Sequence, residues 1–131
     1  MNVYCTYCSR KKDSAPRLLP AIERYNSTRI KGIYEKATID NVELFILSGK
    51  FGFIHCETKI PCYDFCLKSN QVPEIVVKLK WQLANYGISH LAYFTELPED
   101  DPLLKPYKCA IEQACKAADV KFEKHFWTKE G

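Results

Sequence analysis

The order of strand-like and helix-like segments along this chain predicts an α/β protein with a mostly parallel sheet. The chain has 131 residues and 47% hydrophobic content, which is enough for one compact domain with a single core over residues 1–131. Strands that alternate with helices favour a sheet covered on both faces. We therefore expect a Rossmann-like, three-layer α/β/α sandwich with about four strands, whose order is not predicted.

The first half of the chain is predicted to contain two strands and one helix. Residues 2–8 are rich in β-favouring side chains and form the first strand, which we expect to be central. Cap-forming residues at 26–28 precede a predicted helix that runs to about Ala37. Residues 42–48 form a second, buried strand. Residues 51–70 show no clear period, which predicts a long irregular segment packed over a ligand site.

The second half carries the strongest helical pattern. Pro73 opens a helix with apolar residues on one side, and Gly87 ends it. Residues 89–95 are predicted to form a third strand, residues 103–118 a final helix, and residues 120–127 a last strand. An acidic turn separates the third strand from the final helix.

Charge and hydropathy exclude several classes of protein. The net charge is +3 and the acidic residues are spread along the chain, which argues against a dedicated non-specific nucleic-acid binder. A localised basic site remains compatible with this charge. No apolar stretch reaches membrane-spanning length, and the N-terminus lacks the hydrophobic core of a signal peptide. We expect a cytoplasmic protein that has no membrane partner; its oligomeric state is not predicted.

The seven cysteines are an odd number, which favours reduced thiols over a fully paired secreted framework. Cys109 and Cys115 fit the inner face of the final helix. The remaining thiols do not repeat the short knuckle spacing of a conventional zinc site, so small buried thiols are the favoured interpretation and no cofactor is predicted. The metal-binding alternative would use these residues: Cys5, Cys8, Cys62 and Cys66.

Two strand ends carry side chains that suit an anionic ligand. The first strand leads into Cys8, Ser9 and Lys11, within a basic loop. The second leads into Ser48, Gly49, Lys50 and Gly52, which combine a hydroxyl, a cation and glycines that permit close backbone approach or positive φ. In an open α/β sheet, ligands bind outside the carboxyl ends of the strands, so both loops are predicted to face one crevice. The alternative is a solvated basic loop and a plain turn.

A third group lies in the irregular segment, where Tyr63 precedes Asp64. Asp64 is a candidate general base or anchor for a ligand hydroxyl. Its alternative role is that of a turn aspartate that caps backbone amides beside a half-buried tyrosine. His55 has the same ambiguity between a packed side chain and a catalyst.

The order of these motifs resembles a family of uncharacterised bacterial and phage domains with the pattern C-S-x-x-K, L-S-[AG]-K-[YF]-G-[LF] and Y-D. That family is distantly similar to the archaeosine synthase catalytic domain, which acts on a modified deazaguanine base in transfer RNA, and to uracil-DNA-glycosylase-like folds. The resemblance spans about the first half of the chain. Position by position it marks the following residues: Cys8, Ser9, Lys11, Ser48, Lys50, Gly52, Tyr63 and Asp64.

This chain also departs from the family pattern. Gly49 stands where alanine is commoner, and Phe51 and Phe53 replace a tyrosine and a leucine. Three cysteines, Cys56, Cys62 and Cys66, belong to no part of the pattern.

The leading hypothesis is a small enzyme that acts on a nucleotide, nucleoside or modified base, by base modification or glycosidic-bond chemistry. Ser9, Lys11 and Lys50 would hold an anionic group, and nearby aromatic side chains would stack on a planar base. Cys8 is the candidate nucleophile, because a cation and a helix N-terminus nearby would stabilise a thiolate; a buried, inert Cys8 is the alternative. The competing functions are a non-catalytic module that binds a nucleotide or single-stranded nucleic acid, and a metal-binding or redox-responsive protein.

Overall fold

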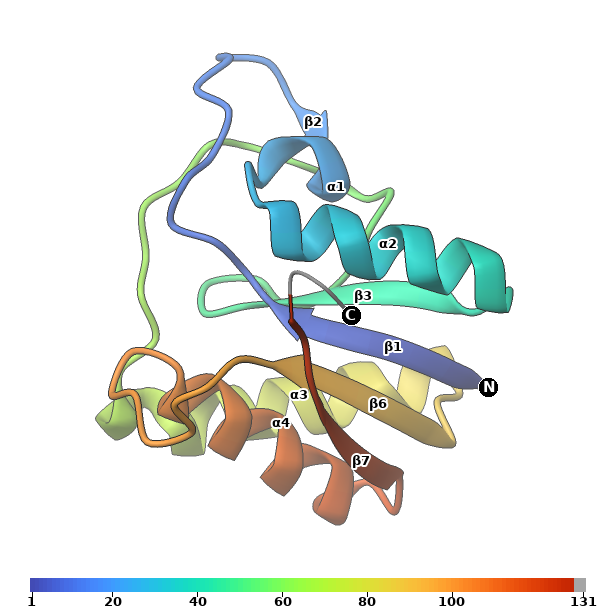
Figure 1. Ribbon diagram of the computed structural model, residues 1–131. Helices are drawn as coiled ribbons and strands as arrows, with labels where there is room; N and C mark the ends of the chain where they lie inside the picture. Colours follow the sequence, from blue (N-terminus) through green and yellow to red (C-terminus); the bar gives the residue numbers. More distant parts are fainter. Residues whose placement is uncertain (129–131) are drawn as a thin grey trace.

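The computed structural model describes residues 1–128 and contains a mostly parallel sheet in a mixed α/β fold (Figure 1). The strand order is β4-β3-β1-β6-β7. Strands β1, β3, β6 and β7 run parallel to one another, and β4 is the antiparallel edge strand. The bounds of these strands are β1 Asn2–Tyr7, β3 Glu43–Ser48, β4 Gly52–His55, β6 His90–Thr95 and β7 Lys121–Phe126.

The helices divide between the two sides of the sheet. Figure 1 shows α1 and α2 on one side and α3 and α4 on the other. The bounds are α1 Ala21–Arg24, α2 Thr28–Asp40, α3 Val72–Tyr86 and α4 Lys105–Ala117. A separate two-stranded ladder joins β2, Leu19–Pro20, to β5, Lys59–Ile60, and a short 3-10 turn, η1, covers Ser69–Gln71.

The helix ends follow the predicted capping chemistry. The side chain of Ser27 accepts a hydrogen bond from the amide of Ile30 at 3.2 Å, which caps the start of α2. Pro73 lies in the first turn of α3, where its missing N–H costs nothing. Gly87 follows the helix with φ 67°, the left-handed conformation that ends many helices. Both boundaries predicted for α3 are therefore confirmed, and α2 extends three residues beyond Ala37 to Asp40.

The prediction of a wholly irregular segment over residues 51–70 is wrong at its start, where β4 pairs with β3, and at Lys59–Ile60, where β5 pairs with β2. The chain reverses between Ser48 and Gly52, and Phe53 then stacks on Phe45 with ring centroids 4.1 Å apart. This strand raises the number in the sheet to five. Most of its side chains are buried, so it lacks the polar alternation that marks a half-buried strand.

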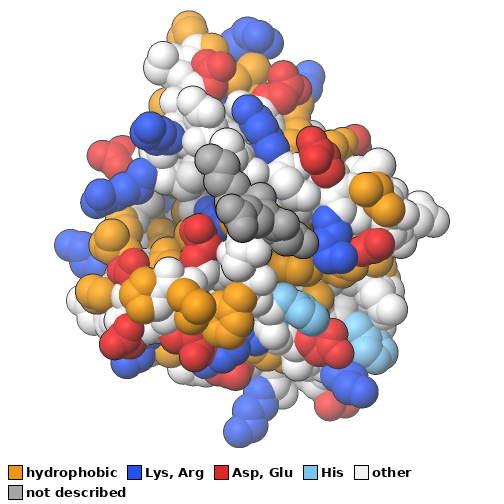
Figure 2. Space-filling model, in the orientation of Figure 1, with side chains coloured by type: hydrophobic (Ala, Val, Ile, Leu, Met, Phe, Trp, Pro, Cys, Tyr) orange, Lys and Arg blue, Asp and Glu red, His pale blue; other side chains and the backbone are white. Residues whose placement is uncertain are grey.

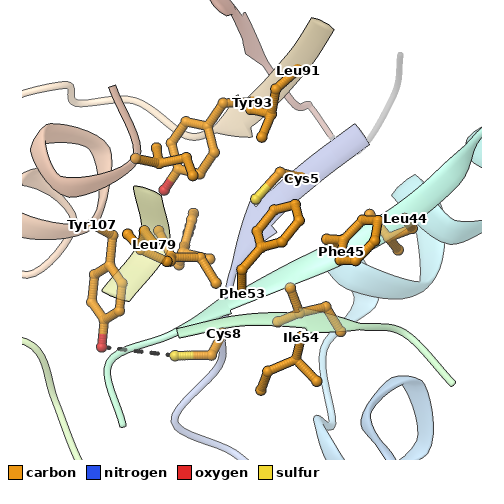
Figure 3. Packing of buried hydrophobic residues seen from close by; sticks show 14 of the residues in the cluster. Cys5, Cys8, Leu44, Phe45, Phe53, Ile54, Leu79, Leu91, Tyr93 and Tyr107 are labelled. Atoms are coloured by element: carbon orange, nitrogen blue, oxygen red, sulfur yellow. Dashed lines mark hydrogen bonds between the residues drawn. The ribbon is translucent and has the colours of Figure 1, made fainter. Parts of the chain in front are cut away.

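The core lies mainly between the sheet and the pair of helices α3 and α4. Figure 3 shows Cys5 of β1, Phe45 of β3, Phe53 of β4 and Tyr93 of β6 within this layer. The first strand is central, as predicted, since β1 pairs with both β3 and β6. By contrast, β7 is at the edge of the sheet and most of its side chains are exposed.

The chain leaves the two neighbouring strands β1 and β6 in opposite directions. After β1 it continues to α1 and α2 on one side of the sheet, and after β6 it continues to α4 on the other side (Figure 1). Connections that diverge from adjacent parallel strands leave a space at their carboxyl ends. This topology agrees with a hollow beyond the carboxyl ends of the two strands, where Tyr7 and Glu96 are found.

Candidate ligand site at the carboxyl ends of β1 and β6

A hollow of about 560 Å³ lies at this point of the fold. Its size is within the range of about 300–1,000 Å³ that is usual for small-molecule sites. Figure 2 shows basic, acidic and hydrophobic side chains together on the side of the molecule where β1 and β6 end. The hollow is lined by the following residues: Tyr7, Cys8, Ser9, Arg10, Lys11, Asn26, Ser27, Thr28, Arg29, Cys66, Glu96, Leu103, Leu104, Tyr107 and Trp127.

The loop after β1 supplies the cationic part of this lining. The amide of Cys8 donates to the carbonyl of Leu47 at 2.9 Å, so the β1–β3 ladder continues by one residue. Ser9 Oγ then donates to the carbonyl of Lys11 at 2.7 Å, which forms a tight turn. The side chains of Arg10 and Lys11 are exposed. Of the predicted site residues, Cys8, Ser9 and Lys11 therefore line the hollow together.

The N-terminus of α2 lies against the same loop. The amide of Asn26 donates to the carbonyl of Lys11 at 2.9 Å, which ties the start of the helix to the basic loop. Asn26, Ser27 and Thr28 all line the hollow. Because the first amides of a helix carry a partial positive charge, this end of α2 favours an anion together with Arg10 and Lys11.

A buried arginine, Arg29, joins the helix to the end of β1. Its guanidinium donates to the hydroxyl of Thr6, to the carbonyl of Tyr7 at 2.9 Å and to the carbonyl of Cys8 at 3.3 Å. It also lies over the ring of Tyr7, 3.5 Å from the centroid. Burial lowers the pKa of Arg29, and the nearby Tyr7 and Glu96 oppose that shift.

Sequence reasoning missed Arg29, although one signal was present. Arg29, Ile33 and Ala37 recur at four-residue spacing, and all three are buried in α2. An arginine on the apolar side of a capped helix needs internal partners. Its spacing therefore indicated a buried cation on the inner face of this helix.

Glu96 follows β6 and faces Arg29 across the crevice. Its Oε1 lies 3.4 Å from Arg29 Nε, and the hydroxyl of Tyr7 donates to the same oxygen. The side chain of Glu96 is 42% exposed, whereas that of Arg29 is 6% exposed. Burial and the hydrogen bond to Glu96 raise the pKa of Tyr7, while the Arg29 cation lowers it; the net direction is upward. Tyr7 is therefore a neutral donor at neutral pH.

The thiol of Cys8 lies on the side of the hollow formed by α4. Its Sγ is 3.7 Å from the hydroxyl of Tyr107, to which it donates (Figure 3). That hydroxyl also accepts a hydrogen bond from the amide of Leu67 at 3.0 Å. Burial raises the pKa of Tyr107. Cys66 also lines the hollow, so two thiols are present in it.

An aromatic residue from the C-terminal end closes another side. Trp127 follows β7, and its amide donates to the carbonyl of Thr95 at 2.8 Å. Its indole packs on Gly32 of α2, where an added Cβ would lie 3.0 Å from Cζ2 of the indole. A glycine at this position lets the ring approach the helix. Leu103 and Leu104 add apolar surface near the start of α4.

The second predicted loop forms a compact polar cluster instead. Ser48 Oγ accepts hydrogen bonds from the amides of Lys50 at 3.1 Å and Phe51 at 3.0 Å. It also lies 2.8 Å from the hydroxyl of Tyr63, which in turn is 2.5 Å from the hydroxyl of Tyr25. Ser48 is fully buried and Tyr63 is 8% exposed. These hydroxyls satisfy one another inside the protein, and neither Ser48 nor Tyr63 is part of the hollow's lining.

The two glycines of this loop also serve the turn. Gly49 packs against Phe65 and Leu67, and an added Cβ would lie 3.0 Å and 3.1 Å from their side chains. Gly52 has φ 81°, and an added Cβ would lie 2.5 Å from Gln82 Oε1. Gln82 receives a hydrogen bond from the amide of Phe53 at 2.8 Å, so its position is fixed.

Lys50 and Asp64 lie at the surface beside this cluster. Lys50 Nζ is 5.9 Å from the ring centroid of Tyr63, and Lys12 Nζ is 4.6 Å from the same centroid. Asp64 is exposed, and within residues 1–128 its carboxylate has no hydrogen bond or ion pair. The predicted site residues thus fall into two groups: Cys8, Ser9 and Lys11 line the hollow, and the others lie in the turn after β3 or beside Tyr63.

In the part of the chain that the structure describes, the four cysteines of the metal-binding alternative do not form a metal site. No group of three or more His, Cys, Asp or Glu side chains there is arranged to hold a metal ion. Cys5 is buried among core residues, whereas Cys62 is exposed. All seven cysteines are free thiols. Burial raises the pKa of the Cys5 thiol and raises that of Cys115 to about 12.

Comparison with known proteins adds no relative: no protein-family model, no curated protein and no solved structure matches this chain. Among the described residues, none of the helices is both long enough and apolar enough to cross a membrane.

Proposed function

We propose that this protein binds a nucleotide-like anionic small molecule in the hollow at the carboxyl ends of β1 and β6. The observation that carries the proposal is the joining of a basic loop, a capped helix N-terminus and an aromatic side chain around one hollow of about 560 Å³. Arg10 and Lys11 with the first amides of α2 suit a phosphate. Trp127 and the leucines suit a planar base.

The same proposal includes the finer description of the fold. A three-layer, Rossmann-like α/β/α sandwich binds ligands where adjacent strands send their connections to opposite sides. The divergence after β1 and β6, and the helices on both sides of the sheet, support this description. The resemblance to base-modifying domains agrees with a nucleotide-like ligand, and the lining residues Cys8, Ser9 and Lys11 belong to its first motif.

Binding is tested by isothermal titration calorimetry with nucleoside 5′-monophosphates, the matching nucleosides and inorganic phosphate. We expect a monophosphate to bind more tightly than its nucleoside, and Lys11→Ala to weaken it by about tenfold, because a charge-assisted contact is lost. Lys80→Ala is the matched control, since Lys80 is exposed on α3 and does not line the hollow. Equal binding of nucleoside and nucleotide would exclude the anionic subsite, and no binding of either would exclude the proposal.

For a chemical step, base modification or glycosidic-bond cleavage, Cys8 is the reactive group that we propose. It lines the hollow, and its thiol meets the hydroxyl of Tyr107. We then expect Cys8→Ser to bind nucleotides as tightly as the wild type but to lose turnover. Turnover is measured by chromatography of reactions with a panel of nucleotides and nucleosides. Turnover that persists in Cys8→Ser would remove the thiol from the mechanism.

A second candidate function is the binding of single-stranded nucleic acid, and the surface around Tyr63 favours it. Lys12 and Lys50 lie near this ring, and Phe65 is exposed nearby in the same segment. Contacts with several phosphates make affinity fall steeply as salt rises. A steep salt dependence for an oligonucleotide, with no binding of mononucleotides, would favour this function over the first.

A further inference from the structure

We propose that Glu96 selects for a sugar hydroxyl, so that the hollow prefers a ribonucleotide to its deoxynucleotide. This inference rests on the proposed function, since it assumes that a nucleotide occupies the hollow. It assigns a specificity-determining role to a residue that no motif of the sequence marks.

One oxygen of Glu96 is anchored and the other is free. The hydroxyl of Tyr7 and Nε of Arg29 both meet Oε1. Within residues 1–128, Oε2 has no hydrogen-bond partner. Two donors on one oxygen restrict the carboxylate, and its second oxygen is left to accept a hydrogen bond from a ligand.

The anchor itself is rigid. Arg29 is held by the hydroxyl of Thr6 and by the carbonyls of Tyr7 and Cys8, and its guanidinium lies over the ring of Tyr7. All of these groups belong to the end of β1 or the first turn of α2. The two donors that meet Glu96 Oε1 are therefore positioned by β1 and α2, and such support favours a site that discriminates between ligands.

The charges of the hollow separate two kinds of ligand group. Arg10, Lys11 and the start of α2 favour an anion, whereas an ionised carboxylate accepts hydrogen bonds and donates none. Glu96 therefore repels a phosphate and accepts from a neutral donor such as a sugar hydroxyl. A ligand with a phosphate at one end and a vicinal diol nearby satisfies both parts of the lining.

A purely structural role for Glu96 would be to neutralise the buried Arg29. That role does not require a free oxygen in a hollow, and the side chain is 42% exposed there. The two roles also differ in their consequences. A neutralising carboxylate affects stability alone, whereas a selecting one affects the ratio of affinities for two ligands that differ by a single hydroxyl.

The test is calorimetric titration of the wild-type protein with the four ribonucleoside 5′-monophosphates and with their 2′-deoxy and 3′-deoxy counterparts. We expect one deoxy series to bind at least about tenfold more weakly, because a hydrogen bond to a charged group is lost. Glu96→Ala should bring the ratio of the two dissociation constants close to one. Glu99→Ala is the matched control, because Glu99 pairs with the exposed Lys124 and does not line the hollow.

The outcomes separate the two proposals. If ribonucleotides and both deoxy series bind the wild type with equal affinity, the proposed role of Glu96 is wrong and nucleotide binding itself still stands. A wild type that binds no nucleotide overturns both. If Glu96→Ala fails to fold, Glu96→Met keeps a side chain of similar length and removes both carboxylate oxygens. A folded Glu96→Met protein with the wild-type ratio overturns the inference, and one with a ratio close to one supports it.

Discussion

The loops after β1 and β3 have similar sequences, yet the structure uses them in opposite ways. Each joins a buried strand to a serine and a lysine within a few residues. After β1, Ser9 and Lys11 line an open hollow. At the last residue of β3, Ser48 is fully buried; its hydroxyl accepts from backbone amides and lies within hydrogen-bond distance of Tyr63.

The difference arises from the path that the chain takes after each strand. The chain after β3 reverses at once into β4, so its serine must satisfy the amides of a tight turn. The chain after β1 leaves the sheet for α2, and its neighbour β6 sends the chain to the opposite side. Under the proposed function, a hydroxyl and a cation at a strand end mark a ligand site only where the connections diverge.

The largest test of this comparison is the removal of the cation that organises the hollow. Arg29→Met should lower the free energy of unfolding by about 2–4 kcal/mol, because the carbonyls of Tyr7 and Cys8 lose a buried partner and Glu96 loses its ion pair. Urea unfolding monitored by circular dichroism measures the change. Lys31→Met, at an exposed position of the same helix, should stay within about 0.5 kcal/mol of the wild type. If Arg29→Met is as stable as the wild type, Arg29 does not organise the hollow.

A second test asks whether the loop after β3 is a structural turn. Gly52→Ala places a Cβ at φ 81° and 2.5 Å from Gln82 Oε1. We expect a loss of about 2–3 kcal/mol in stability, from the left-handed backbone and from the displaced Gln82. Gly87→Ala is the matched control: its φ is 67°, but nothing lies within 4 Å, so only the backbone cost of about 1 kcal/mol remains. Equal losses of stability in the two variants would mean that the Gln82 side chain moves away at little cost and that this turn is not tightly packed.

A third test uses pH to probe the hydroxyl cluster. Burial raises the pKa of both Tyr25 and Tyr63 in the folded protein. The stability that this shift contributes is present below the unfolded value near 10 and is lost as pH rises above it. Between about pH 9 and about pH 11, the wild type should therefore lose about 1 kcal/mol for each such tyrosine.

Tyr63→Phe supplies the comparison for that titration. It should be less stable than the wild type at neutral pH by about 1–2 kcal/mol, because Ser48 and Tyr25 lose a partner, and its stability should fall less between the two pH values. Nucleotide affinity should be unchanged, since Tyr63 does not line the hollow. If Tyr63→Phe abolishes nucleotide binding while the protein stays folded, the two loops have been assigned the wrong roles.

Much of the fold was predictable because its signals are local. The cap at Ser27 and the glycine at Gly87 are short-range patterns, and both are confirmed. Strand β4 was missed because its four residues are mostly buried and show neither the alternation of a half-buried strand nor the period of an amphipathic helix. Helix α1 was missed because it has a single turn.

The site was less predictable because its members come from separate strands. Arg29 was visible in principle, from its four-residue spacing with Ile33 and Ala37. Glu96 was not, since its meeting with Tyr7 depends on β6 lying beside β1, and strand order leaves no trace in the sequence. The motif residues Ser48 and Tyr63 are explained by packing, which a linear motif does not distinguish from ligand binding.

The smallest expected effect belongs to Lys50 and Asp64, the surface residues of the second loop and of the segment beside it. Both are exposed and neither lines the hollow, so Lys50→Ala and Asp64→Ala should change nucleotide affinity by less than about twofold, or about 0.4 kcal/mol. Titration of the two variants beside Lys11→Ala measures the contrast directly. The comparison is informative because Lys11 and Lys50 are both exposed lysines that follow parallel strands. A loss at Lys50 as large as at Lys11 would mean that the ligand reaches across Tyr63 and that the two loops form one site, as the motif order alone predicted.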